Sequence, residues 1–272
     1  MITDFKGKTA VITGGAHGIG YAFAQECLGK GMNVVITASR QSSVDKAVAT
    51  LEGGDRLIGV QSDAGDAEAN AKLAKLVKDK FGQPSLLVLN AGISRMAPIH
   101  DLTPEKWRQT LSVNLDGVAY GTLAFLPLME QQTEAHIVIN ASIFGFFSAG
   151  LQAPYFASKA GAVAFAETLY YDLLAAGSPV GVSLLCPGNT RTNILETALT
   201  GEEPEEFRQL IEAEMAAGTS PAFVAQATLD AVRDNTFYVT PNTGDFIYPI
   251  EARFDRILKG RNPAPEDVGD TV

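Results

Sequence analysis

The chain has 272 residues, 46% of them hydrophobic and 19% charged, which is the composition of a soluble globular protein with a substantial core. Its 21 basic and 31 acidic side chains give a formal net charge of −10, and no basic run could follow a phosphate backbone, which argues against nucleic acid as a partner. Two isolated cysteines, Cys27 and Cys186, argue against a disulfide framework or a four-ligand zinc site and favour a reducing compartment.

The first residues, MITDFKGKTAVIT, do not combine a charged stretch with a long apolar one, as a secretion signal would. No later segment carries about 18 uninterrupted apolar residues, which a membrane-spanning helix needs. We therefore expect a cytoplasmic protein that does not enter a membrane.

Seven short apolar runs predict strands, at 8–13, 32–38, 56–61, 85–90, 135–141, 180–186 and 236–240. Longer amphipathic segments lie between them and predict helices. The alternation predicts an α/β fold in which helices cover both faces of a doubly wound, mostly parallel sheet of about seven strands. We expect the whole chain, 1–272, to form a single domain.

A glycine-rich segment, TGGAHGIG at 13–20, lies between the first predicted strand and the helix after it. Glycines there permit a sharp turn and close backbone approach, and the helix directs unpaired N–H groups at a pyrophosphate. The spacing GxxxGxG differs from the commoner GxGxxG, but its place between strand and helix indicates a dinucleotide site. A turn without a ligand is the alternative. The predicted cofactor contacts of this segment are Gly14, His17, Gly18, Ile19 and Gly20.

The second predicted strand ends in Ala38-Ser39-Arg40, where an NAD site would place an acidic residue for the ribose 2′-hydroxyl. A hydroxyl and a guanidinium stand there instead, and Arg binds phosphate through bidentate, charge-assisted hydrogen bonds. Ser39 and Arg40 therefore predict NADP(H) in preference to NAD(H), with His17 near the same phosphate. A solvated surface arginine is the alternative.

The third and fourth predicted strands end in further candidate cofactor residues. Asp63 is placed to accept a hydrogen bond from the adenine amino group, or to cap a helix that begins near Ala64. Asn90, Ala91 and Gly92 follow the fourth strand, and their small size lets the adenosine ribose lie against the backbone.

Two helix starts carry a hydroxyl cap followed by proline, at Thr103-Pro104 and Ser220-Pro221. Gly31 and Gly82 follow helical segments and are candidate C-terminal caps.

Tyr155 and Lys159 are four residues apart in a segment with helical periodicity, so both side chains share one face. A phenol titrates near pH 10, and its use as a proton shuttle at neutral pH requires a shift of about three units, roughly 4 kcal/mol. A positive charge about 4 Å away supplies roughly that amount at an effective dielectric constant near 20. Ser142, at the end of the fifth predicted strand, is placed to donate a hydrogen bond to a substrate carbonyl oxygen.

Together these segments resemble the short-chain dehydrogenase/reductase family. The resemblance rests on TGGAHGIG at 13–20, NAG at 90–92, Asn114 within VNLDGVAYG, Ser142, YFASK at 155–159 and PGNTRT at 187–192. It covers residues 8 to about 192 and implies a Rossmann-type sheet with NAD(P) as the hydride carrier. Leu89 stands where asparagine is frequent in the family and Ala141 where a second serine is common, and neither change removes a reacting group.

The resemblance implies a catalytic set formed by Asn114, Ser142, Tyr155 and Lys159. In such enzymes Tyr is the acid and base, Ser polarises the substrate oxygen, Lys binds the nicotinamide ribose and lowers the Tyr pKa, and Asn holds a water molecule of a proton relay. Outside the family, Asn114 alone would be a buried hydrogen-bonding residue between two helices. The resemblance also implies cofactor contacts at Tyr155, Lys159, Pro187, Gly188, Thr190 and Thr192.

The predicted substrate pocket is mostly apolar. By analogy with the family, its predicted contacts are Ser94, Ser142, Phe144, Phe147, Tyr155, Asn189 and Ile194, with Ile93, Met96, Ile143, Gln152 and Leu195 also in its wall. Facing aromatic rings would select a hydrophobic or aromatic ketone or secondary alcohol. Core positions for Phe144 and Phe147 are the alternative. An acidic insertion at 190–219 predicts a substrate lid, and the last residues, 262–272, predict a frayed tail.

We expect an NADP-dependent alcohol dehydrogenase or carbonyl reductase. A regulatory protein that senses NADP without turnover, and an epimerase or dehydratase of the same family, are the alternatives. Three scattered histidines predict no metal site. The family resemblance implies a homo-oligomer, a dimer or tetramer, formed by helices near 104–129 and 153–176.

Overall fold

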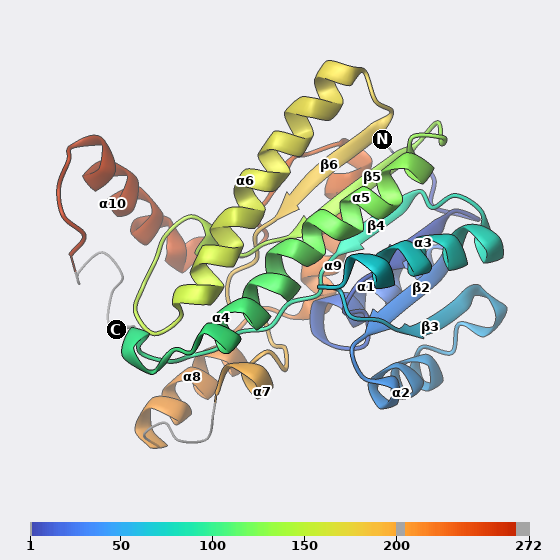
Figure 1. Ribbon diagram of the computed structural model, residues 1–272. Coiled ribbons are helices and arrows are strands. Elements are labelled where there is room, and N and C mark those ends of the chain that lie inside the picture. The colour runs from blue at the N-terminus through green and yellow to red at the C-terminus, as the bar shows by residue number, and fades with distance from the viewer. Residues whose placement is uncertain (1, 200–204, 265–272) are drawn as a thin grey trace.

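The computed structural model describes residues 2–199 and 205–264, and these residues form one parallel sheet flanked by helices (Figure 1). The strands of the described chain are β1 Thr9–Ile12, β2 Asn33–Ala38, β3 Leu57–Gln61, β4 Leu86–Leu89, β5 Ala135–Asn140, β6 Val180–Leu185 and β7 Tyr238–Val239. Each lies within a segment predicted to be a strand. The predicted α/β fold with a seven-stranded parallel sheet is therefore confirmed.

The strand order is β3-β2-β1-β4-β5-β6-β7, and every pairing is parallel. The order reverses between β1 and β4, the point at which open α/β sheets form a crevice outside the carboxyl ends of their strands. β1, β4 and β5 are buried along their whole lengths. This explains their continuous apolar runs, because helices cover both faces of a parallel sheet.

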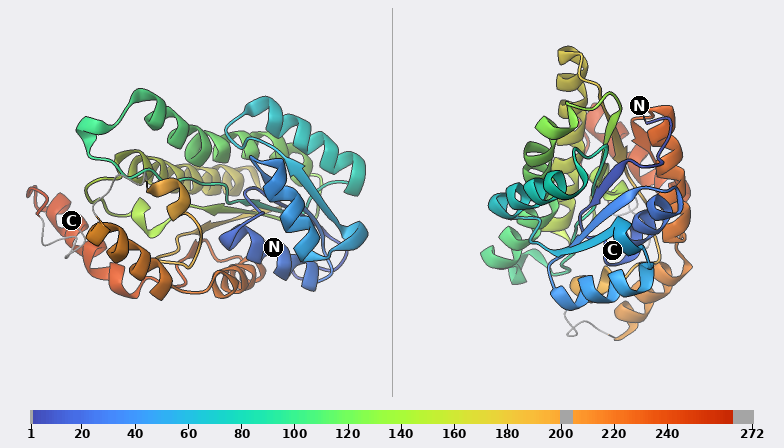
Figure 2. Two further views of the ribbon diagram at one scale, coloured as in Figure 1. Left: turned by 90° about the horizontal axis from the view of Figure 1, so that it is seen from below. Right: turned by 90° about the vertical axis from the view of Figure 1, so that its right-hand side faces the viewer.

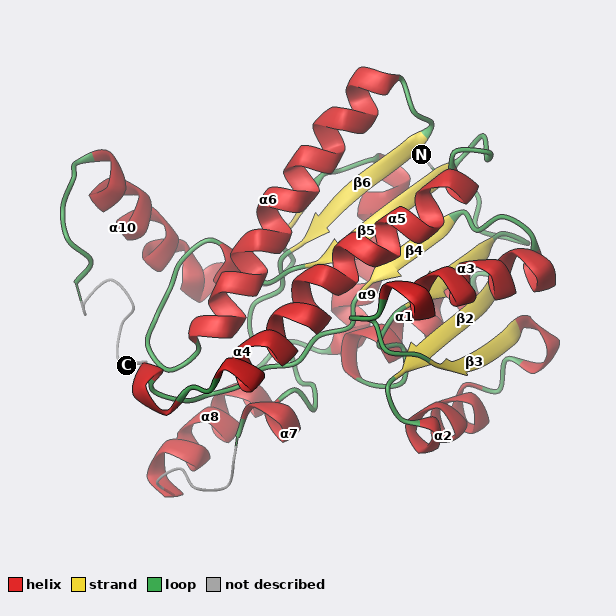
Figure 3. Cartoon of the chain, viewed as in Figure 1, coloured by secondary structure: helices red, strands yellow, loops and turns green. Residues whose placement is uncertain are grey.

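Helices lie on both faces of the sheet, as the edge-on view in Figure 2 shows. One face carries α3, α5 and α6, and the other carries α1 and α9. The secondary-structure colours of Figure 3 separate these helices from the sheet between them. The α-helices of the described chain are α1 Gly18–Gly29, α2 Gln41–Leu51, α3 Ala67–Phe81, α4 Pro104–Leu111, α5 Gly117–Met129, α6 Ala153–Ala176, α7 Leu195–Ala198, α8 Glu205–Ala217, α9 Pro221–Asp234 and α10 Ile247–Leu258. Shorter turns are η1 Gly54–Arg56, η2 Ile99–Asp101, the π-helical η3 Ser112–Asp116, η4 Ile143–Gly145 and η5 Gly244–Phe246.

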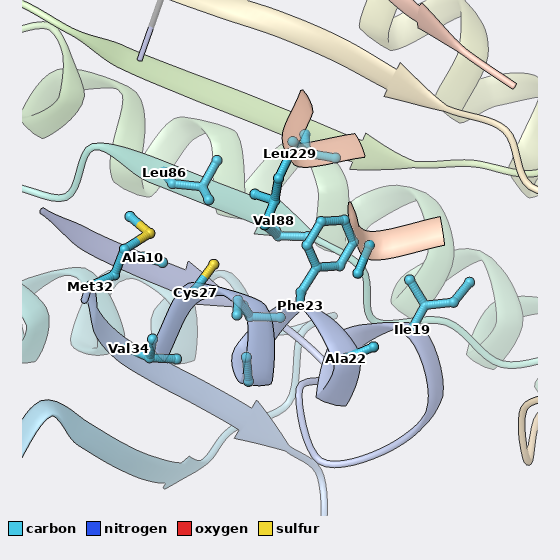
Figure 4. Packing of buried hydrophobic residues seen from close by; sticks show 14 of the residues in the cluster. Ala10, Ile19, Ala22, Phe23, Cys27, Met32, Val34, Leu86, Val88 and Leu229 are labelled. Atoms are coloured by element: carbon cyan, nitrogen blue, oxygen red, sulfur yellow. The ribbon is translucent and has the colours of Figure 1, made fainter. Parts of the chain in front are cut away.

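Two hydrophobic clusters hold the helices on the sheet. On one face, Phe23 of α1 lies beside Val88 of β4 and Leu229 of α9, and all three are fully buried (Figure 4). On the other face, Phe125 and Met129 of α5 are buried in a cluster that α3, α6 and the strands complete. Burial of such a side chain stabilises the fold by about 1.5–3 kcal/mol.

The predicted helix starts are confirmed. The Thr103 hydroxyl accepts a hydrogen bond from the Lys106 amide at 3.3 Å, and the Ser220 hydroxyl accepts one from the Phe223 amide at 3.2 Å. Gly82 caps α3 with φ +78° and Gly31 follows the cap residue of α1 with φ +80°, values that favour glycine.

The alternative that Asp63 caps the next helix is wrong. The helix α3 begins at Ala67, and the carboxylate of Asp66 accepts the capping bonds, from the amides of Glu68 at 2.7 Å and Ala69 at 3.1 Å. Asp63 closes the turn before it, where its carboxylate accepts a bond from the Gly65 amide at 2.9 Å. The sequence offers two aspartates three residues apart, and only the distance to the helix start decides between them.

The run Pro104–Met129 is long and apolar enough to cross a membrane by length and composition alone, a test that core helices of soluble proteins also pass. In this fold its segments pack against α3 and α6. Part of the predicted lid, 200–204, and most of the predicted tail, 265–272, lie outside the described residues.

Candidate active site

A cavity of about 710 Å³ lies at the carboxyl ends of the strands and joins the glycine-rich turn to Tyr155. Most of the residues predicted for the site line it: Gly14, His17, Gly18, Ile19, Ser39, Arg40, Asp63, Asn90, Ala91, Gly92, Ser94, Ser142, Phe144, Tyr155, Lys159, Pro187, Gly188, Asn189, Thr190, Thr192 and Ile194. Five other predicted wall residues line it too, Ile93, Met96, Ile143, Gln152 and Leu195. Gly20, Asn114 and Phe147 are not in its lining.

The glycine-rich turn packs tightly against the ends of neighbouring strands. A Cβ atom on Gly14 would lie 2.9 Å from the Ala91 Cα atom, and one on Gly18 would lie 2.9 Å from a Thr192 methyl carbon. Both glycines also have positive φ, +63° and +54°. Since α1 begins at Gly18, its free N–H groups stand at the cavity, as a dinucleotide pyrophosphate requires.

Gly20 packs behind the glycine-rich turn and does not line the cavity. It is buried, and a Cβ atom there would lie 2.4 Å from the Gly14 carbonyl oxygen and from the Asn90 amide nitrogen. The predicted cofactor contact of Gly20 is therefore indirect, because its lack of a side chain lets the turn close.

The end of β2 carries basic and hydroxyl side chains. Arg40 is exposed, lines the cavity, and makes no side-chain hydrogen bond or ion pair with the described residues. Ser42, Ser43 and Lys46 of α2 line the same end, and sequence reasoning missed them. The signal was present, because Ser42 and Lys46 are four apart on one helical face. Together they could hold a phosphate at this end.

A chain of hydrogen bonds connects the glycine-rich turn to Lys159. The side-chain Nδ2 atom of Asn90 donates to the carbonyl oxygens of Thr13 at 3.0 Å and Gly14 at 3.2 Å. The Asn140 amide nitrogen donates to the Asn90 side-chain oxygen at 2.8 Å, and the Lys159 Nζ atom donates to the Asn140 carbonyl at 2.9 Å. These bonds fix the two ends of the site relative to each other, and Asn140 was not predicted as part of it.

Tyr155 and Lys159 of α6 are buried together beside Ser142. Lys159 is 4% exposed, and its Nζ atom lies 5.6 Å from the centroid of the Tyr155 ring. Burial lowers the pKa of Lys159 to about 8. Burial raises the pKa of Tyr155 to about 12, although interaction with the Ser142 hydroxyl acts in the opposite direction.

The expected lowering of the Tyr155 pKa by Lys159 is therefore not present in the protein alone. The lowering was expected from a full positive charge about 4 Å from the phenol. In the structure desolvation is the largest influence on the pKa of Tyr155, and it also favours the neutral form of the lysine. The phenol is held protonated, which suits a proton donor.

Ser142 lies two residues after β5 and is the N-cap of η4. Its Oγ atom accepts a hydrogen bond from the Phe144 amide at 3.2 Å, and the Ile143 amide donates to the Pro187 carbonyl at 3.0 Å. These bonds hold the Ser142 side chain, which is 6% exposed, at the cavity wall. The Ser142 hydroxyl also interacts with the Tyr155 phenol, so both hydroxyl groups meet in the same part of the cavity.

Asn114 lies in η3, behind the cavity wall, and is 1% exposed. Its side-chain oxygen accepts from the Ile93 amide at 2.9 Å, and its nitrogen donates to the Ile93 carbonyl at 2.9 Å and the Ser158 hydroxyl at 3.0 Å. The residue thus ties the loop after β4 to α6, as expected for a buried hydrogen-bonding asparagine. Its role in a proton relay stays a prediction.

The part of the cavity beyond Ser142 is lined by η4, α7 and α8, and we call it the substrate end. Phe144 lines the cavity, and its ring packs against the rings of Phe147 and Phe156 at 5.2 Å and Phe246 at 5.7 Å between centroids. Phe147 is 6% exposed and faces this cluster, so its predicted substrate contact is not seen. The alternative of a core position describes Phe147.

Two short helices within the predicted lid form the far wall. The helix α7 is fastened to the loop after β4, because the Met96 amide donates to the Ala198 carbonyl at 2.9 Å and Arg95 donates to the Thr197 carbonyl at 3.0 Å. The helix α8 adds residues that sequence reasoning missed, spaced as one helical face: Ile211, Glu214 and Met215. Among the described residues, no three His, Cys, Asp or Glu side chains gather to hold a metal ion.

The fold, the glycine-rich turn at the strand reversal and the buried Tyr-Lys pair define a nucleotide-binding α/β protein of the dehydrogenase class. The short chain dehydrogenase family model matches residues 8–203, and the chain belongs to the short-chain dehydrogenase/reductase family. The chain is thus an oxidoreductase by family, whose members use a nicotinamide cofactor and small-molecule substrates.

Individual relatives differ in the activity and cofactor that their names give. The chain is 33% identical over 281 residues to the C alpha-dehydrogenase of a Sphingobium species, with 97% of this chain and 90% of that protein covered. It is 34% identical over 204 residues to the NADP-dependent (R)-specific alcohol dehydrogenase of Lentilactobacillus kefiri, with 75% and 81% covered. A Burkholderia phymatum short-chain dehydrogenase/reductase solved in complex with NAD superposes with a TM-score of 0.89 at 33% identity, covering 97% of this chain and 98% of that one.

Proposed function

We propose that this protein is an NADP(H)-dependent oxidoreductase that interconverts hydrophobic or aromatic ketones and the corresponding secondary alcohols. The observation that carries the proposal is one cavity lined by the glycine-rich turn and by Ser142, Tyr155 and Lys159. Such a cavity brings a bound dinucleotide and a substrate oxygen to the same buried hydroxyl groups.

In the direction of reduction, the Ser142 hydroxyl donates a hydrogen bond to the substrate carbonyl, and Tyr155 gives its phenolic proton to the oxygen as negative charge develops there. The nicotinamide cofactor, when bound, supplies the hydride to the carbonyl carbon. Lys159 is held by Asn140, binds the nicotinamide ribose, and stabilises the tyrosinate while it awaits a new proton. The net change is ketone, NADPH and one proton to alcohol and NADP.

Preference for NADP is supported by the charge at the adenosine end. Arg40 and Lys46 line it, while the carboxylate that would accept from the ribose 2′-hydroxyl is missing after β2. The carboxylate of Asp63 lines the same end but is already used by the Gly65 amide. A 2′-phosphate would place two negative charges beside Arg40 and Lys46, whose charged groups have no partner among the residues that the structure describes.

A hydrophobic substrate is supported by the apolar side chains at one end of the cavity. Phe144, Met96, Ile194, Ile211 and Met215 line that end. Glu214 faces the cavity from α8 and disfavours anionic substrates. We propose that α7 and α8, within 190–219, act as a lid that excludes water during transfer.

The remaining proposals concern assembly and location. Leu123 of α5 and Tyr171 and Leu174 of α6 are 66–70% exposed, which supports burial of these helices in a homo-oligomer. A cytoplasmic location is supported by the soluble fold and the two free, buried cysteines. Size-exclusion chromatography with light scattering reads the oligomeric state, and Leu174→Glu should yield a smaller species.

The proposed activity is tested with a panel of aryl and alkyl ketones and secondary alcohols, read by NADPH absorbance. We expect turnover of apolar members, with carboxylated analogues turned over at least about tenfold more slowly. Binding of NADPH without oxidation by any carbonyl, or substrate conversion without net NADPH change, would contradict the proposal.

A further inference from the structure

The amide of Gln152 is held in the wall of the substrate end. Gln152 precedes α6 directly and is three residues before Tyr155. Its Oε1 atom accepts a hydrogen bond from the Ser94 hydroxyl at 3.1 Å, and both residues line the cavity. Ser94 is a polar side chain only 4% exposed, and its hydroxyl has no other partner among the described residues.

The backbone on both sides of this pair is fixed. Leu151 has φ +65°, a left-handed conformation that costs a non-glycine residue on the order of 1–3 kcal/mol. The Ala97 amide donates to the Leu151 carbonyl at 2.7 Å, and the Gln152 amide donates to the Gly150 carbonyl at 2.9 Å. The Ser94 amide donates to the Thr197 hydroxyl at 3.3 Å. The strained turn therefore persists because surrounding bonds hold Gln152 in place.

A glutamine amide has one acceptor oxygen and two N–H donors. Ser94 occupies the oxygen and so orients the group, which leaves the Nε2 donors without a partner in the described part of the chain. An oriented donor in the wall of a pocket is the kind of polar group that fixes a ligand's orientation. The mechanism proposed for Ser142, Tyr155 and Lys159 makes no use of it.

We propose that Gln152 Nε2 binds a second oxygen of the substrate, so that the preferred substrates are oxygenated ketones and alcohols. This inference rests on the proposed function. The second oxygen would be a hydroxyl, ether or carbonyl oxygen, because each of these accepts a hydrogen bond from an amide N–H. Ser94 acts as a positioning residue for the amide.

The test compares matched ketones that differ only in one oxygen, such as an aryl ketone with and without an alkoxy group on the carbon next to the carbonyl. We expect kcat/KM for the oxygenated member to be about tenfold higher, the size of one neutral hydrogen bond. Gln152→Leu should bring the ratio close to one. Gln152→Glu keeps an acceptor for Ser94 but removes both donors, and should bring the ratio to one or below it.

Ser94→Ala should lower the same ratio about threefold, because the amide then rotates freely. Gln131→Leu, an exposed glutamine at the end of α5, is the matched control and should keep the wild-type ratio. Equal kcat/KM values for the two ketones in the wild type, or a preference that survives in Gln152→Leu, would overturn the inference.

Binding separates this inference from the proposed function. The two corresponding alcohols are titrated calorimetrically into protein saturated with NADP, which reads the subsite even if no hydride is transferred. A Kd about tenfold lower for the oxygenated alcohol, lost in Gln152→Leu, supports the subsite whatever the turnover. Equal Kd values overturn it, whereas turnover failing with every ketone overturns the proposed function.

Discussion

The two ends of the cavity are built differently. The cofactor end is assembled from residues that follow directly on strand ends, and backbone packing fixes it, as at Gly14, whose missing side chain admits Ala91. The substrate end is assembled from η4, α7 and α8, which are held by side chains such as Arg95 on Thr197. The first end can therefore be recognised from short motifs at the strand ends, whereas the second depends on where α7 and α8 are placed.

The largest effect is expected in the glycine-rich turn. Gly14→Val places a β-branched residue at φ +63° and a Cβ atom 2.9 Å from the Ala91 backbone. The free energy of unfolding should fall by at least about 1–3 kcal/mol, and NADPH affinity by more than about 100-fold. Thermal unfolding and NADPH fluorescence titration measure these.

The control for this variant is a second glycine, at the end of the helix that follows the turn. Gly29→Ala, at the end of α1, meets no atom within 4 Å and should bind NADPH like the wild type. If Gly14→Val also binds NADPH normally, the turn does not form the cofactor end.

A smaller effect is expected for the adenosine phosphate. Arg40→Ala removes a charged donor and should weaken NADP binding by about 10- to 100-fold while changing NAD binding by less than about threefold. Isothermal titration with both cofactors measures the difference, and Lys78→Ala on the distant face of α3 serves as control. Equal losses for the two cofactors would make Arg40 an ordinary surface charge.

A several-fold effect is expected on the rate of proteolysis within the proposed lid, 190–219. Trypsin cleavage after Arg208 of α8 should slow at least about fivefold when NADP and a ketone are present together, because ligand binding disfavours the open lid. Cleavage after Arg261, beyond α10, is the internal control. Identical rates at Arg208 with and without ligands would contradict closure.

The last prediction depends on pH and concerns His136, in β5. Its Nε2 atom lies 2.8 Å from the Ser183 hydroxyl, and burial lowers its pKa from 6.5 to about 3. The unfolded chain binds this proton below pH 6.5 and the folded chain does not, so stability is lost as the pH falls from 6.5 toward 3, by up to about 1.4 kcal/mol per pH unit. Urea unfolding of His136→Gln should show a shallower pH dependence than the wild type; parallel curves would refute this.

The sequence predicted the features that neighbouring residues encode. Strands, the hydroxyl caps at Thr103 and Ser220, and the glycine-rich turn each depend on a short segment. The helical spacing of Tyr155 and Lys159, the place of Ser142 after a strand and the family resemblance together indicated these three site residues. Features that depend on distant contacts were missed or misplaced. Phe147 packs into the aromatic cluster because the rings of Phe156 and Phe246 contact it there. Glu214 lines the cavity only because α8 lies beside it.

The Tyr155 pKa belongs to the second group, because desolvation depends on the packing of the whole site. The neighbouring ammonium was visible in the sequence, but the burial that opposes it was not. The hydrogen bond between Ser94 and Gln152, which are 58 residues apart, is likewise visible only in the structure.

The most direct test of the account is Tyr155→Phe, which removes one oxygen atom from the buried pair and leaves the cofactor end intact. We expect kcat to fall by about 100- to 10,000-fold on any ketone that the wild type reduces, while the NADPH Kd changes by less than about threefold. A variant that keeps most of its activity would contradict the assignment of Tyr155 as the proton donor, and with it the identification of this cavity as the catalytic site.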